Sequence, residues 1–275
     1  MAKYRGLIWQ YFMTTLTKWL FKLFASLLLA GQVVVHILLK RRLHRRNILE
    51  QMSIVGTESI PIALVTAAFV GGVFTIQVAK EFIRFGAQSV IGGVLAIALT
   101  RELCPVLTAV IIAARIGSAF AAEIGTMRVT EQIDALVMLG TDPIDYLVTP
   151  RVIACVLMLP ILMIFALLTG ILGACLVSQA LYNINPTSFF DSIQLLLKPW
   201  DLVAALVKSS IFGSLIALIG TNWGLNTTGG AKGVGESTTT AVVTALLAIF
   251  TTNFFLSWFL FGNVGGTIAK NFGFD

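Results

Sequence analysis

Two residues of opposite charge, Arg101 and Glu102, interrupt an otherwise apolar stretch of the sequence, residues 89–114. Ionisable groups are costly at hydrocarbon depth, so they usually face a protein interior or a water-filled cavity and are often functional. Pro105 has no N–H and clashes with the carbonyl four residues back, so it should free the Arg101 carbonyl at the same level. The block therefore predicts either the wall of a polar cavity or a structural ion pair that holds helices together, and the residues alone favour neither.

A second charged segment, residues 115–151, is acidic for a chain that runs beside lipid headgroups. Thr130 is a suitable cap for a short helix, with Glu131 in its first turn and Gly140 at its stop. On a helical wheel the apolar face holds Ile133, Leu136 and Val137, and the opposite face holds Glu131, Asp134 and Met138. We expect a surface helix that presses its acidic face on a soluble partner; a helix that merely connects spans would explain the amphipathicity but not the acidity.

Other chemical motifs are weak. The glycine-rich segment 227–240 does not match a phosphate-binding loop, because Lys232 is followed by Gly233 and no strand precedes it, so we expect a flexible turn there. No nucleophile elbow or zinc-protease motif occurs, and Glu102 is the one acid placed for acid/base chemistry near the bilayer. The three cysteines lie in apolar runs without paired spacing. We expect a non-catalytic chain without a cofactor or a metal site.

The elements that position these charges are membrane spans. Hydrophobic residues make up 57% of the 275 residues and charged residues 12%, about half the charged share of a soluble domain. Apolar runs of about 20 residues or more can cross a bilayer. We predict an all-α integral membrane protein with five spans, at residues 59–79, 89–114, 152–181, 209–231 and 237–269. The fourth span has an alternative start near Leu202, and the last closes near Phe261.

The N-terminal region differs from the rest. Nine of the nineteen lysine and arginine residues lie before residue 47, which favours the cytoplasmic side for this end. We predict that residues 1–49 form a basic interfacial segment with an amphipathic helix, and residues 23–39 remain an alternative sixth span. Lys208 is counted as a borderline charge of an outer loop. No cleavage site precedes the basic cluster, so we expect no signal peptide or transit segment.

The sequence resembles the MlaE/YrbE permease family, the membrane subunits of MCE-type lipid-transporting ABC systems. The similar residues span about 50 to 265, and residues 50–275 would form the permease domain. The matching motifs are Arg101-Glu-Leu-x-Pro-Val-Leu-Thr-Ala, Ala114-Arg-x-Gly-Ser-Ala, Ala122-Glu-Ile-Gly-Thr-Met-x-Val-Thr-Glu-Gln-Ile-Asp-Ala-Leu136, Asp142-Pro143, Pro150-Arg151 and Gly230-Ala-x-Gly-Val-Gly-x-x-Thr-Thr-x-Ala-Val-Val243.

The resemblance implies a homodimeric permease that moves lipid, in the first place phospholipid, with a separate cytoplasmic ABC ATPase and an MCE-domain lipid-binding partner. It also assigns two groups of site residues. Arg101, Glu102, Phe74 and Gln77 would line a lipid cavity at the dimer interface, and Glu123, Arg128, Glu131 and Asp134 would couple to the ATPase. The host membrane would be a bacterial inner membrane or a plastid inner envelope.

Two alternatives remain open from the sequence. The chain could be a scaffold that anchors the ATPase and the lipid-binding protein without gating lipid itself. It could also be an ion-coupled carrier, which would transport without ATP and depend on a gradient. Lipid bound inside a dimer cavity would distinguish a permease from the scaffold.

Overall fold

The computed structural model describes residues 25–26, 28–33, 35–36 and 45–262, and every regular element within them is helical. Five helical segments are long and apolar enough to cross a membrane, which confirms the predicted all-α membrane fold. These segments are Arg45–Arg84, Gln88–Val129, Ile144–Tyr182, Pro199–Leu225 and Gly230–Phe261. Most of residues 1–49 lies outside the described residues, and the alternative span at 23–39 is described only in part, at 25–26, 28–33 and 35–36, so those predictions stay untested.

The first of these segments consists of α2 (Arg45–Gly56) and α3 (Ile60–Arg84), and α3 is its apolar, membrane-crossing part. The second begins with the short 3₁₀ turn η1 (Gln88–Val90) and continues as α4 (Ile91–Ala98), α5 (Cys104–Ile112) and α6 (Ser118–Val129). Two π-helical turns, η2 (Leu99–Leu103) and η3 (Ala113–Gly117), join these three helices. The remaining elements are α7 (Gln132–Met138), η4 (Ile144–Val148), α8 (Thr149–Tyr182), α9 (Pro186–Leu196), α10 (Pro199–Leu225) and α11 (Gly230–Phe261).

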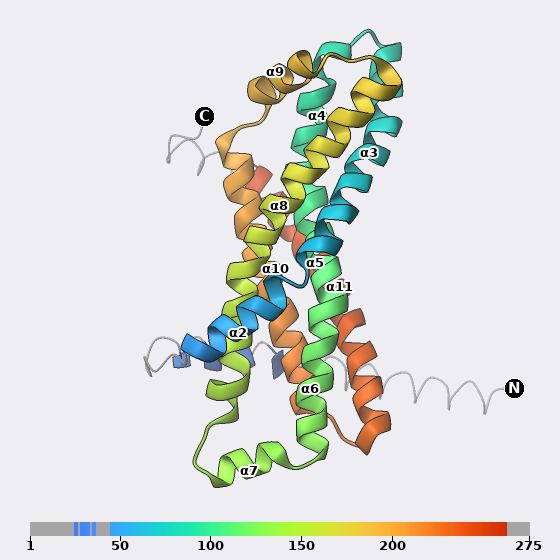
Figure 1. Ribbon diagram of the computed structural model, residues 1–275. Helices are drawn as coiled ribbons and strands as arrows, with labels where there is room; N and C mark the ends of the chain where they lie inside the picture. Colours follow the sequence, from blue (N-terminus) through green and yellow to red (C-terminus); the bar gives the residue numbers. More distant parts are fainter. Residues whose placement is uncertain (1–24, 27, 34, 37–44, 263–275) are drawn as a thin grey trace, which may run out of the picture.

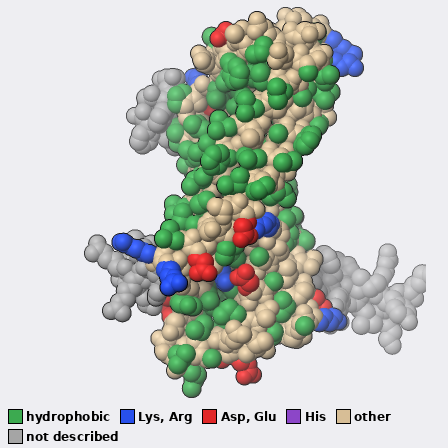
Figure 2. Space-filling model, viewed as in Figure 1, with side chains coloured by type: hydrophobic (Ala, Val, Ile, Leu, Met, Phe, Trp, Pro, Cys, Tyr) green, Lys and Arg blue, Asp and Glu red, His purple; other side chains and the backbone are tan. Residues whose placement is uncertain are grey.

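The molecule is elongated, with α7 at one end and α9 at the other (Figure 1). The helix α8 runs through both halves: it packs on α3 in the half that carries α9, and on α10 towards the other half. The helices α6, α10 and α11 pack together in the half nearer α7. Apolar side chains cover most of the α9 half, whereas most charged side chains on the face shown in Figure 2 lie in the half nearer α7. This division is expected when one end of a long bundle extends out of the bilayer.

Glycines set the distance between α3 and α8. A Cβ on Gly71 would run into the Gly170 backbone, and a Cβ on Gly173 would run into the Ala68 backbone. Small residues that let helix backbones approach closely are a main source of helix association in membranes, because lipid removes the hydrophobic driving force between spans. The pair α3 and α8 therefore depends on these positions being glycine.

The helix of the second span is longer than predicted. The inner loop, expected at residues 115–151, is therefore shorter than predicted. The helix continues to Val129, since charges that looked like the end of a span are satisfied by partners. Arg115 donates to the Ser59 hydroxyl at 2.7 Å and pairs with Glu58. Arg151 pairs with Glu123 at 2.8 Å.

The short helix α7 is confirmed, but its predicted cap is wrong. The Thr130 hydroxyl donates back to the Thr126 carbonyl at 2.8 Å, so Thr130 closes α6 instead of opening α7. Glu131 is the residue before α7 and has a left-handed backbone, with φ 61°. Gly140 follows the end of α7 with φ 75°, as its predicted role in the stop requires.

Two further boundaries differ from the prediction. The helix α10 begins at Pro199, not at residue 209, because the Lys208 charge is compensated inside the protein and does not end the span. The glycine-rich segment is helical from Gly230 onward, and the turn is limited to residues 226–229. Glycine and threonine have low helix propensity, but propensity is a weak signal that membrane and tertiary context override.

The α3–α8 contact gives a first prediction. The variant Gly71→Ala should lower the free energy of unfolding by about 1–3 kcal/mol, because the added methyl group forces the two backbones apart. Thermal unfolding in detergent, followed by circular dichroism, measures the change. Gly235→Ala is the matched control: Gly235 lies in α11 with open space around its Cβ position, and its substitution should leave the unfolding temperature unchanged or raise it. Equal effects of the two substitutions would contradict a role for close packing at Gly71.

Candidate functional site

The second span is irregular directly before Pro105, where the sequence predicts a carbonyl without its helical hydrogen bond. The π-helical turn η2 directly precedes this proline and carries Arg101 and Glu102. Pro105 has no N–H to donate to the Arg101 carbonyl. This carbonyl accepts a hydrogen bond from the Lys208 ammonium group at 2.9 Å instead. The prediction that a freed carbonyl coincides with the charges is therefore confirmed.

Lys208 of α10 is the centre of this site. Its side chain is completely buried, with an exposed fraction of 0%. Its Nζ donates to the Arg101 carbonyl, to Glu102 Oε1 at 2.9 Å and to Ser257 Oγ at 2.7 Å. A protonated ammonium group has three hydrogens, so every donor is used. The burial of this charge is tolerated because each hydrogen meets an oxygen.

Glu102 receives further hydrogen bonds from α11. The Ser257 hydroxyl donates to Glu102 Oε1 at 2.7 Å, and the Asn253 amide donates to Oε2 at 2.8 Å. The carboxylate thus connects the second span to both α10 and α11. Charge-assisted bonds of this kind are about twice as strong as neutral ones, so the three spans are held in one arrangement.

A second ion pair extends the site towards the start of α10. Arg101 Nε donates to Asp201 Oδ1 at 2.8 Å, and Asp201 Oδ2 accepts from the Lys198 backbone N–H at 3.1 Å. Asp201 is buried, with an exposed side-chain fraction of 1%. The Phe261 ring lies 4.6 Å from the Arg101 guanidinium and 5.2 Å from the Lys208 ammonium, within cation–π distance of both.

We call the group formed by these side chains the polar cluster. Its members are Arg101, Glu102, Asp201, Lys208, Asn253 and Ser257. Two positive and two negative charges make it neutral, which is the condition for stable burial. It is closed on one side and open on the other: Lys208 and Asp201 are buried, whereas 34% of the Arg101 side chain and 43% of the Glu102 side chain remain exposed.

Sequence reasoning found Arg101 and Glu102 but missed their partners. Lys208 was treated as a loop charge, and Asp201, Asn253 and Ser257 were not singled out. A signal was present in the spacing: Asp201 and Lys208 are seven residues apart, and Asn253 and Ser257 are four apart, so each pair lies on one helix face. Spacing alone does not show which faces meet.

Phe74 and Gln77 lie on α3. Phe74 is partly buried and packs against an apolar cluster that includes Leu99. Leu99 is the first residue of η2, two positions before Arg101. Gln77 is exposed. Within the described residues, no hydrogen bond of the polar cluster involves either side chain, so their assignment to a lipid cavity stays a prediction.

The four residues assigned to coupling lie around α7 and the adjoining part of α6. Glu123 pairs with Arg151, and Arg128 pairs with Asp134 at 2.7 Å. Glu131 is exposed. These two ion pairs hold the chain in place before α7 but leave Glu131 and Asp134 exposed to solvent.

The apolar face of α7 is narrower than the wheel predicts. Ile133 is buried and packs with Ile124 and Leu147. Val137, expected on the same face, is 54% exposed, and Met138 is 88% exposed. The reason is the length of α7, which at seven residues places one side chain in the core before the chain turns away. The end of the molecule that α7 forms (Figure 1) therefore exposes apolar and acidic side chains together.

Helical spans that enclose ionisable groups are typical of membrane permeases and transporters. Comparison with known proteins agrees with this class. The family model described as Permease MlaE matches residues 48–259. The chain belongs to the MlaE family of ABC transporter permeases, as its resemblance predicts.

Several known proteins are similar to this chain over most of its length. A probable ABC transporter permease protein of Synechocystis sp. is 64% identical over 253 residues, which cover 92% of this chain and 96% of the relative. The protein TRIGALACTOSYLDIACYLGLYCEROL 1, chloroplastic, of Arabidopsis thaliana is 51% identical over 88% of this chain and 69% of its own length. A probable ABC transporter permease protein of Rickettsia prowazekii is 39% identical over 83% of this chain and 88% of the relative.

The polar cluster gives a second prediction. The variant Lys208→Met should lower the free energy of unfolding by about 2–3 kcal/mol, below the range for a fully buried pair because Glu102 is partly exposed. Adding Glu102→Gln in the same chain should recover part of the loss, since no unpaired charge is then left between the spans. Thermal unfolding of the two single variants and the double variant measures this coupling.

Lys232→Met is the matched control. Lys232 is 88% exposed and lies 3.9 Å from Glu236 on α11, so its loss should change stability little. Additive effects of Lys208→Met and Glu102→Gln would contradict an energetic coupling within the polar cluster.

Proposed function

We propose that this chain is the membrane subunit of an ATP-driven transporter that moves phospholipid or a related lipid between membranes. It acts as a homodimer, with ATP hydrolysis on a separate cytoplasmic ATPase and with an MCE-domain protein that receives or delivers the lipid. The observation that carries the proposal is the polar cluster with one open side. Membership of the MlaE permease family supports the transport role.

The open side of the polar cluster needs a polar cover. A charged side chain exposed to hydrocarbon is unfavourable, and 43% of the Glu102 side chain is exposed in a single copy of the chain. A second copy placed over this side would enclose a cavity in which Arg101 and Glu102 face water or a lipid headgroup. A zwitterionic or anionic phosphate group is a suitable partner for the Arg101 guanidinium.

The helix α11 supplies the surface for this assembly. It is the least buried of the five described spans, because only 17% of its apolar 18-residue stretch is buried inside the protein. Phe250, Phe254 and Trp258 recur every four residues along it and are all exposed, so they form one apolar stripe. An apolar stripe that ends beside the polar cluster can hold lipid chains while the cluster binds the headgroup.

The two ends of the molecule suit different partners. The proposed orientation has α7 and the basic residues of the N-terminal region on the cytoplasmic or stromal side, following the bias of lysine and arginine. There, Glu131 and Asp134 together with the exposed Met138 form the contact with the ATPase. The end that carries α9 then faces the MCE-domain partner.

The names of the relatives support a lipid cargo and a host membrane. The Arabidopsis thaliana relative is chloroplastic and is named after a galactolipid. The Synechocystis relative is bacterial. We therefore place this chain in a bacterial inner membrane or a plastid inner envelope. The scaffold and the ion-coupled carrier are tested as the alternatives.

The third prediction concerns lipid transfer. In the complex reconstituted with its ATPase, the double variant Glu102→Gln/Lys208→Met should reduce ATP-dependent transfer of fluorescent phospholipid between vesicles by about tenfold or more, because the cavity wall loses the Glu102 carboxylate beside Arg101 while the spans keep a neutral contact. Lys232→Met serves as the control with unchanged transfer.

The complex must remain assembled for this result to count, which co-purification of the ATPase with the double variant establishes. Unchanged transfer by the double variant would favour the scaffold. Transfer that persists without ATP but collapses with the ion gradient would favour the carrier.

The fourth prediction concerns the ATPase contact. Charge reversal with Glu131→Lys and Asp134→Lys should reduce the ATPase that co-purifies with the permease by about tenfold, since like charges would then face each other across the contact. Asp191→Lys, the same type of charge reversal at a single exposed position of α9, is the control and should retain the ATPase. Loss of the ATPase from the control and not from the α7 variant would place the contact at the other end.

A further inference from the structure

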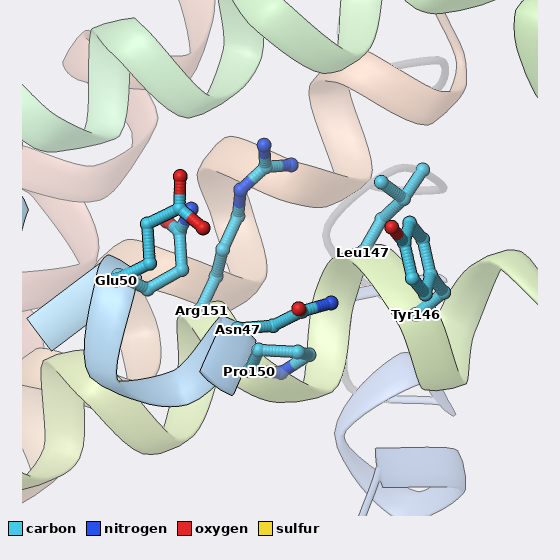
Figure 3. Close-up of a pocket in the computed structure, with 7 residues that line it drawn as sticks. Asn47, Glu50, Tyr146, Leu147, Pro150 and Arg151 are labelled. Atoms are coloured by element: carbon cyan, nitrogen blue, oxygen red, sulfur yellow. The ribbon is translucent and has the colours of Figure 1, made fainter. Parts of the chain in front are cut away.

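A polar pocket lies where α2 crosses the beginning of α8. Its volume is about 170 Å³. It is lined by Asn47, Glu50, Gln51, Tyr146, Leu147, Pro150 and Arg151. Figure 3 shows Asn47 and Glu50 on α2 beside Pro150 and Arg151 of α8, with Tyr146 and Leu147 of η4 at the right of the view. We call it the α2–α8 pocket.

Arg151 is the anchor of this pocket, and one of its donors has no acceptor. The residue is 7% exposed. One end of its guanidinium group, Nη2, donates to Glu123, and the Phe120 ring lies 5.2 Å away. The other end, Nη1, is buried and makes no hydrogen bond. Buried donors of charged groups are nearly always paired, so this one points to a partner that binds in the pocket.

A buried acceptor in the same pocket is also unpaired. The Gln51 side-chain oxygen is enclosed and has no donor. Arg151 and Gln51 both line the pocket, so a residue with an unpaired donor and a residue with an unpaired acceptor border one cavity from two different helices. A single ordered water needs about 15 Å³ of such space, so a pocket of this size accepts a larger polar group.

The charges of the pocket select the type of ligand. The positive charge of Arg151 is already balanced by Glu123, and Glu50 adds a negative charge at the lining. A free anion would meet this carboxylate and be repelled. A hydroxyl group both donates and accepts, so a ligand with several hydroxyls can satisfy Arg151, Gln51 and Glu50 together without adding charge.

The position of α2 shows where such a ligand comes from. This helix starts with Arg45 and Arg46, carries polar residues on the side of the pocket, and exposes Leu49 to 66%. A helix of this pattern lies in the headgroup layer of a membrane. The α2–α8 pocket therefore opens among lipid headgroups, away from the polar cluster.

We propose that the α2–α8 pocket binds the neutral, hydroxyl-bearing headgroup of a membrane lipid, namely a sugar headgroup. The bound headgroup joins α2 to α8 through Arg151 and Gln51. This lipid is distinct from the transported one, because the pocket and the polar cluster share no residue. The proposal therefore stands or fails independently of the transport cavity.

The experiment is native mass spectrometry of the full chain released from nanodiscs. The nanodiscs contain monogalactosyldiacylglycerol, phosphatidylcholine and phosphatidylglycerol with the same acyl chains in equal amounts. The wild type should retain the galactolipid in preference to the other two lipids. Gln51→Leu should reduce this preference by about fivefold, the loss of one hydrogen bond to a neutral group.

Gln194→Leu is the matched control, since Gln194 is exposed on α9 and its substitution should leave the preference intact. A preference for phosphatidylglycerol, or equal retention of the three lipids, would overturn the proposal. So would a galactolipid preference that Gln51→Leu leaves unchanged. Displacement of the retained galactolipid by millimolar methyl β-galactoside, in the wild type and not in Gln51→Leu, would support a headgroup site and show that the sugar itself is recognised.

A stability measurement separates a filled pocket from an empty one. If the pocket holds a headgroup, Gln51→Leu should lower the unfolding temperature in galactolipid nanodiscs and not in phosphatidylcholine nanodiscs. A variant that is more stable than the wild type in both would overturn the proposal, because removing an unpaired buried amide then helps everywhere.

Discussion

One lysine ammonium group, enclosed between three spans, decides how this protein is assembled. Lys208 lies in an apolar helix and is fully buried, so it is stable only while each of its hydrogens meets an oxygen. Those oxygens come from the second span and from α11. If either helix moved by about one turn, a charge would be left unpaired in a medium that solvates it poorly. The ammonium group therefore determines the register of α10 against both neighbours, a task that lipid-facing apolar side chains cannot perform because lipid satisfies them equally well.

The backbone is adapted to this interaction at the same level. Pro105 removes an N–H from the helix ladder, the π-helical turn η2 precedes it, and the Arg101 carbonyl becomes an acceptor for Lys208. Single π turns in α-helices occur often at functional sites, because they redirect side chains by a fraction of a turn. Here Arg101 and Glu102, adjacent in sequence, pair with different residues of α10, Asp201 and Lys208. A regular helix with all its hydrogen bonds intact would offer no carbonyl at this position.

Two polar sites therefore exist in an apolar protein, and they differ in how complete they are. In the polar cluster the charges balance and every Lys208 hydrogen has an acceptor, and the one buried atom of the cluster without a partner is the neutral Asn253 side-chain oxygen. The exposed part is a carboxylate and a guanidinium group. In the α2–α8 pocket a buried donor on Arg151 and a buried acceptor on Gln51 lack partners. The first arrangement suits a cavity wall past which a charged headgroup moves, since it persists with or without cargo. The second suits a ligand that stays bound, because the protein alone leaves its hydrogen bonds unmade.

The sequence by itself determined the all-α membrane class, the five spans that follow residue 45, the freed carbonyl before Pro105, the short helix that stops before Gly140 and the family. These follow from local composition and from motifs, because an apolar run of sufficient length has few alternatives to a spanning helix. The tertiary structure decided which charges belong to which helix. Lys208, Arg115 and Glu123 were predicted to lie in loops, yet each lies within a helix, because an ion pair or hydrogen bond from a distant segment compensates its charge. Such compensation depends on which helix faces meet, and no window of a single helix contains that information.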